Sequence, residues 1–86
     1  MEWKVQYSQT ANEFLAKMDN KQAEIIFRKI NSTKLNPHHF FEKMVSLPFY
    51  KIRIGDYRVI ADLKEQVQII AVIKIGHRKK VYKEME

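Results

Sequence analysis

The chain has 86 residues, no cysteine and a formal net charge of +6 at pH 7. A chain of this length folds as one small domain, residues 1–86, and the lack of cysteine excludes disulfides and thiolate metal sites. We find neither a signal sequence nor an apolar run that could span a membrane, so we expect a cytoplasmic protein without a membrane partner.

The positive charge is concentrated in the second half of the chain. Residues 49–83 hold nine basic and three acidic side chains, whereas the rest of the chain holds seven of each. An excess confined to one region indicates a face that binds a polyanion such as nucleic acid. A solvated surface or a patch that meets an acidic protein partner would have the same composition.

The chain begins with a predicted strand and helix. Residues 3–7 (WKVQY) alternate with period two, which is typical of a short strand. Ser8 or Thr10 can cap a helix after it, because a hydroxyl there accepts a backbone N–H. The apolar face of that helix is expected to consist of Ala11, Phe14, Leu15 and Met18.

A second helix is predicted over roughly residues 21–31, with Asp19-Asn20 as its cap. Two helices joined by so short a turn form an antiparallel hairpin. Asn36-Pro37 ends the helical region, because the residue before proline disfavours the α conformation. The buried stripe of the second helix is expected to be Ala23, Ile26, Phe27 and Ile30.

Residues 38–48 are predicted to be irregular but packed down, since the stretch is rich in phenylalanine and aliphatic residues. His38 and His39 have neither carboxylate nor cysteine partners there, so we expect no metal site and no cofactor. Phe40, Phe41 and the methionines are interpreted as core residues, and Trp3 as a packing residue on the first strand.

Three strands are predicted next, over residues 49–54, 57–63 and 67–75, the last of them central because it is apolar on both faces. The expected fold class is α+β in the order β-α-α-β-β-β, a twisted, mostly antiparallel sheet with the helical hairpin on one face. The helix-covered face is expected to carry Ile52, Ile54, Val59, Ala61, Ile69 and Ile73. The opposite face is expected to carry Lys51, Arg53, Arg58 and Lys74.

The stretch YKIRIGDYRVI, residues 50–60, predicts a hairpin around Gly55-Asp56. This register opposes Ile54 to Tyr57 and Arg53 to Arg58, and like charges directly opposed across strands are destabilising. A phosphate bound between the two arginines would relieve the repulsion. Such a departure from local stability is typical of a functional site.

The sequence Y-K-I-R-I-G-D-Y-R-V-I, followed by I-G-H-R-K-K-V-Y, resembles the RelE/ParE superfamily of toxins from type II toxin–antitoxin modules. In that superfamily, RelE-like members cut mRNA in the ribosomal A site, whereas ParE-like members poison DNA gyrase. The resemblance implies a cognate antitoxin, RelB-like on the RelE branch, as a partner. Lys51 together with Tyr82 favours the RelE branch.

The resemblance to RelE implies that the catalytic residues are Lys51, Arg53, Arg58, Arg78 and Tyr82. Arg53 stands where the active enzymes often have lysine, and an arginine does not give up its proton. Lys51 is the candidate base, and the two hairpin arginines would bind the phosphate. Arg78 would stabilise the leaving side or act there as the acid, and Tyr82 would stack on a base or help orient the 2′-hydroxyl. Lys74, His77 and Lys79 complete the residues expected to bind RNA or phosphate.

The function expected on this basis is that of an mRNA interferase, a ribosome-dependent endoribonuclease that inhibits translation. The 2′-hydroxyl of the RNA attacks the adjacent phosphate, so the reaction needs positioning and charge stabilisation and no metal. The partners would be the antitoxin, the ribosome and mRNA. The alternatives are a ParE-like gyrase inhibitor or a catalytically inactive relative.

Overall fold

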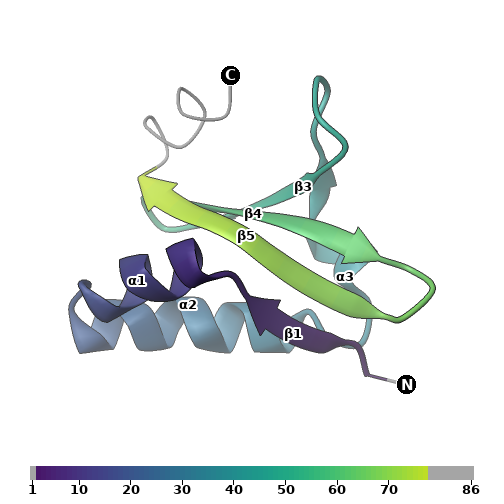
Figure 1. Cartoon of the computed structure of the whole chain (residues 1–86). Coiled ribbons are helices and arrows are strands. Elements are labelled where there is room, and N and C mark those ends of the chain that lie inside the picture. The colour runs from purple at the N-terminus through teal and green to yellow at the C-terminus, as the bar shows by residue number, and fades with distance from the viewer. Residues whose placement is uncertain (1, 78–86) are drawn as a thin grey trace.

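The computed structural model describes residues 2–77 and has the predicted α+β class (Figure 1). Helices α1 and α2 cover one face of a five-stranded sheet, and we call the opposite face the outer face. The elements in chain order are β1 (Lys4–Tyr7), α1 (Gln9–Ala16), α2 (Asn20–Ser32), α3 (Pro37–Phe40), β2 (Glu42–Lys43), β3 (Tyr50–Ile54), β4 (Tyr57–Lys64) and β5 (Ile69–His77).

Each helix of the hairpin begins at a residue whose side chain caps it. Ser8, and not Thr10, caps α1, where its Oγ accepts from the backbone N–H of Ala11 at 3.0 Å. Asp19 caps α2 as predicted, and its carboxylate accepts from the backbone N–H of Lys21 at 3.2 Å. Each cap satisfies a backbone donor that has no partner within its own helix.

The buried stripe of α2 is narrower than predicted. Ala23, Ile26 and Ile30 are buried, but Phe27 is 37% exposed. At 100° per residue Phe27 lies on the margin of this stripe, where its ring meets Tyr7 edge to face at 5.3 Å. The hydroxyl of Tyr7 is buried without a hydrogen-bond partner among the described residues, and burial raises the pKa of Tyr7 to about 12.

The sheet has the strand order β1-β5-β4-β3-β2. β1 pairs with β5 in parallel and all other neighbours are antiparallel, so the mostly antiparallel prediction is confirmed. β5 is an interior strand, as its two apolar faces predicted, although β4 has the middle position. The N-terminal and C-terminal strands therefore lie side by side (Figure 1).

One expectation about β5 is wrong. Ile69 and Ile73 were expected to face the helices, but the core side chains of this strand are Ile70, Val72 and Ile75. The reason is a β-bulge: Ile60 pairs with Lys74 and Ala61 pairs with Val72, so Ile73 is passed over. One extra residue reverses the alternation of side chains beyond it. The other four predicted core residues, Ile52, Ile54, Val59 and Ala61, are in the core.

Residues 38–48 are more ordered than predicted, because they contain α3 and the two-residue strand β2. Phe41 and Met44 are buried as expected, whereas Phe40 is 40% exposed and Val45 is fully exposed. Met44 packs with Ile60, Leu47 and Phe49 in a second, small apolar cluster. Trp3 is also buried, and its ring meets His38 edge to face at 5.9 Å. No helix within residues 2–77 is long and apolar enough to cross a membrane.

Candidate anion-binding site

The β3–β4 hairpin forms with the predicted register. Arg53 is paired with Arg58, and Ile54 with Tyr57. The turn begins at Gly55, whose φ of +61° is a conformation that residues with a side chain rarely adopt. Nothing lies within 4 Å of a Cβ placed at Gly55, so the turn requires its backbone conformation and not its small size.

The strands place the basic side chains in two cross-strand rows on the outer face. The first row runs through Glu42, Lys51, Ile60 and Lys74 on the four strands β2, β3, β4 and β5. The second row runs through Arg53, Arg58 and Gly76. Because Gly76 has no side chain, β5 places nothing beside Arg58 on this face. The cations therefore face a shared surface.

A cavity of about 240 Å³ opens on this surface, and we call it the cationic cavity. It is smaller than the roughly 300–1,000 Å³ of pockets for drug-sized ligands, and three of its six lining residues are basic. Arg53 is also held at the hairpin turn, where its Nε donates to the carbonyl of Gly55 at 3.1 Å. The lining residues are Phe40, Glu42, Lys51, Ile52, Arg53 and Arg58.

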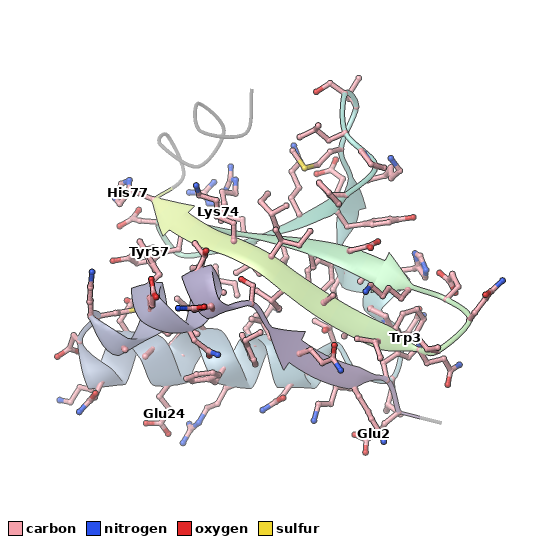
Figure 2. The ribbon with its side chains drawn as sticks, viewed as in Figure 1. Glu2, Trp3, Glu24, Tyr57, Lys74 and His77 are labelled. Atoms are coloured by element: carbon pink, nitrogen blue, oxygen red, sulfur yellow. The ribbon has the colours of Figure 1, made fainter. Side chains whose placement is uncertain are left out.

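The structure brings together four of the predicted site residues. Lys51, Arg53 and Arg58 line the cationic cavity, and Lys74 lies on the same face, across from Ile60. Figure 2 shows Lys74 on the side of β5 away from α1 and α2. Three further predicted site residues, Arg78, Lys79 and Tyr82, lie outside the described residues.

His77 is not part of this cluster. It pairs across from Tyr57, whose other register partner, Ile54, belongs to the core, and the two rings meet edge to face at 5.7 Å. Tyr57 in turn contacts Phe14 of α1 at 6.0 Å, so His77 stands at the end of an aromatic column directed towards the helices (Figure 2). His77 thus lies apart from Lys51, Arg53 and Arg58, and its binding to phosphate stays a prediction.

Sequence reasoning did not assign three residues of the cavity to the site: Phe40, Glu42 and Ile52, the last of which was predicted only as a core residue. Phe40 and Glu42 lie in the stretch predicted to be irregular, and a two-residue strand such as β2 is too short to show alternation. Glu42 is the one carboxylate among the residues that line this cavity, and it is paired directly with Lys51. The site thus combines three cations, a carboxylate and an aromatic ring. Within residues 2–77 no group of three His, Cys, Asp or Glu side chains could hold a metal ion.

Three solved structures have this fold over nearly the whole chain. The RelBE2 toxin–antitoxin complex of Mycobacterium tuberculosis matches with a TM-score of 0.83 at 15% identity, over 91% of this chain and 100% of that chain. A mutant of the E. coli toxin RelE in the free state matches with a TM-score of 0.80 at 21% identity, over 98% of this chain and 94% of that chain. The archaeal RelE–RelB complex of Pyrococcus horikoshii matches with a TM-score of 0.77 at 20% identity, over 93% of this chain and 99% of that chain. At these identities the likeness defines the fold, which is that of the RelE toxins.

The family follows from the sequence itself. The family model of the ParE toxin of the type II toxin–antitoxin system parDE matches residues 5–82. The chain belongs to this family and is a toxin of a type II toxin–antitoxin module. The resemblance to the RelE/ParE superfamily is thereby confirmed. No curated protein matches the sequence at a significant level.

Proposed function

We propose that this toxin is a RelE-like endoribonuclease that cuts translated mRNA in the ribosomal A site. The observation that carries the proposal is the cationic cavity, in which Lys51, Arg53 and Arg58 converge from two antiparallel strands. Guanidinium groups match the oxygens of a phosphate, and a bound phosphodiester would offset the repulsion between the two opposed arginines. Ribosome and mRNA are then the further partners, which makes the cytoplasm the place of action.

The chemistry requires only the protein, its substrate and water. The 2′-oxygen attacks the adjacent phosphorus, its proton passes to Lys51 as the candidate base, and the bond from phosphorus to the 5′-oxygen breaks as that oxygen takes up a proton from water. The products are a cyclic 2′,3′-phosphate and a 5′-hydroxyl. Arg53 and Arg58 stabilise the charge on the phosphorane. The resemblance implies the two remaining roles: Arg78 acts at the leaving oxygen, and Tyr82 stacks on a base.

The test is cleavage of a defined mRNA in a purified translation system. The wild-type chain is expected to cut at codon positions, mapped by primer extension, and Lys51→Ala is expected to reduce the rate by about 10²-fold or more, the contribution of a general base. Arg78→Ala should abolish cutting. Lys21→Ala on α2 is the matched control, because it removes the same charge on the far side of the sheet and should cut normally. Intact mRNA with the wild-type chain at toxic doses would overturn the proposal.

A second candidate function is the inhibition of DNA gyrase without catalysis. It is favoured by the family description, which names ParE toxins. Supercoiling of plasmid DNA by purified gyrase separates the two functions directly. Inhibition by the chain at micromolar concentration, with mRNA left intact, would establish this second function. Uninhibited gyrase would reject it.

We also propose that an antitoxin covers the basic outer face. The solved structures matched from Mycobacterium tuberculosis and Pyrococcus horikoshii are complexes of a toxin with an antitoxin. An acidic segment would complement Lys51, Arg58 and Lys74. Co-expression with the product of the neighbouring open reading frame should yield a stable complex that Lys51→Glu weakens and Lys21→Glu does not. Growth that continues when the chain is expressed alone would instead indicate an inactive relative.

A further inference from the structure

The bulge at Ile73 determines which way Lys74 points. Val72 faces the core, so uninterrupted alternation along β5 would turn Ile73 outward and Lys74 inward, into the apolar layer beneath the helices. Because the pairing passes over Ile73, Lys74 is instead opposite Ile60 on the outer face. In this position it belongs to the same cross-strand row as Lys51. Without the bulge, the outer face would lose one of its cations.

Ser8 forms two hydrogen bonds with the backbone of the bulge. Its hydroxyl donates to the carbonyl of Ile73 at 2.6 Å, and its backbone N–H donates to the carbonyl of the preceding residue, Val72, at 2.9 Å. The same Oγ accepts from the N–H of Ala11 and so caps α1. A bulged residue is left out of the regular ladder, so its carbonyl needs a partner from elsewhere. Ser8 supplies that partner from 65 positions away in the chain.

We infer that Ser8 is a positioning residue for the outer face. It holds the bulge at Ile73 and thereby keeps Lys74 on the outer face, in the cross-strand row that also contains Lys51, where both can meet the same polyanion. The part of this inference that concerns ligand binding rests on the proposed function, whereas the part that concerns the bulge does not. A residue that only capped α1 would affect stability and leave the direction of Lys74 unchanged.

Three uncharged substitutions separate these roles. Ser8→Thr keeps the hydroxyl and should retain both contacts. Ser8→Ala removes both the cap and the contact with the bulge. Ser8→Gly also removes the hydroxyl, but glycine at an N-cap costs much less stability than alanine does. An effect on binding that is equal in the alanine and glycine variants, despite their different stabilities, therefore reports the bulge and not the cap.

The experiment measures the affinity of the whole chain for a single-stranded RNA oligonucleotide by fluorescence anisotropy. Lys74→Ala should weaken binding roughly fivefold at about 0.1 M salt, as expected for the loss of one phosphate contact. Ser8→Ala and Ser8→Gly should weaken it similarly, and Ser8→Thr should restore wild-type affinity. In the Ser8→Ala background, Lys74→Ala should have no further effect. Two independent, additive losses would overturn the inference.

Nuclear magnetic resonance provides the readout that does not depend on RNA. In the wild-type chain, cross-strand contacts should join the backbones of Ile60 and Lys74, as the register requires. These contacts should disappear in Ser8→Gly and persist in Ser8→Thr. If the wild-type chain fails to bind RNA, the proposed function fails at that step, while loss of the Ile60–Lys74 contacts in Ser8→Gly still supports the role of Ser8. Unchanged contacts in Ser8→Gly would refute that role.

Discussion

Arg53 and Arg58 are directly paired across β3 and β4, with their side chains on the same face of the sheet. Like charges at such a position are destabilising by roughly 0.2–1 kcal/mol. The pair lies in the cationic cavity, where a bound anion would offset the cost. The relationship therefore predicts that stability and anion binding respond in opposite ways when one arginine is neutralised.

We expect salt to stabilise the wild-type chain more than Arg53→Gln. Arg53 is exposed and Arg58 half-buried, so salt screens the repulsion between them in part. From about 0.02 M to about 0.5 M salt the wild-type free energy of unfolding should rise by roughly 0.2–1 kcal/mol relative to the variant. Urea unfolding at each salt concentration measures this. Arg53→Lys keeps the charge and should follow the wild type. Parallel salt profiles for wild type and Arg53→Gln would show that the two guanidinium groups do not repel each other appreciably.

Glu42→Gln should tighten the binding of single-stranded RNA by about two- to fivefold, because it removes a negative charge from a cavity that receives phosphate. The matched control is Glu24→Gln on α2, which changes the net charge equally but acts on an exposed carboxylate paired with Arg28 at 2.6 Å (Figure 2). Anisotropy titrations at one salt concentration compare the two. Equal effects of both substitutions would indicate that only the net charge matters.

Ile60→Ala should lower the free energy of unfolding by about 2–4 kcal/mol. Ile60 is fully buried on the outer side of β4, where it packs with Met44, Leu47 and Phe49. Its loss leaves a void that these neighbours fill only in part. Val45→Ala in the same region should change stability by less than about 0.5 kcal/mol, since Val45 is fully exposed. Urea unfolding of both variants is the measurement, and a small loss for Ile60→Ala would mean that this second cluster contributes little.

Tyr7→Phe should stabilise the chain by roughly 1 kcal/mol at neutral pH, because it removes a buried hydroxyl that has no partner among the described residues. The advantage should widen above pH 10. The folded pKa of Tyr7 is raised to about 12 from 10.0, so the unfolded state loses its proton first and wild-type stability falls between pH 10 and 12.

Two measurements check this prediction. Urea unfolding at pH 7 and pH 11 gives the difference in stability at each pH. Absorbance titration of the tyrosines should show that the phenolate that forms last in the wild-type chain is missing from Tyr7→Phe. A difference in stability that stays constant from pH 7 to pH 11 would contradict the raised pKa.

The parts of the fold that depend on neighbouring residues could be predicted from the sequence. The β3–β4 hairpin follows from the alternation around Gly55-Asp56, and the start of α2 follows from Asp19. The convergence of Lys51, Arg53 and Arg58 follows from the same local register.

The parts that depend on distant residues could not be predicted. The bulge at Ile73 is held by a hydrogen bond from Ser8, which is distant in the sequence. Alternation within β5 alone therefore predicted the wrong core residues for that strand. Glu42 joins the site only because β2 pairs with β3, and two residues carry no periodic signal. The contact of His77 with the ring of Tyr57 likewise depends on the pairing of β5 with β4, which the sequence around His77 does not show.

The parallel pairing of β1 with β5 has a consequence for how the protein is made. Residues 4–7 have no strand to pair with until residues 69–72 have been synthesised and have left the ribosomal exit tunnel. The helical hairpin and the β3–β4 hairpin can form from contacts close in sequence, whereas the parallel edge of the sheet cannot form before β5 is available. A nascent chain that has not yet exposed residues 69–72 therefore holds β1 without its partner strand, however early β1 itself was synthesised.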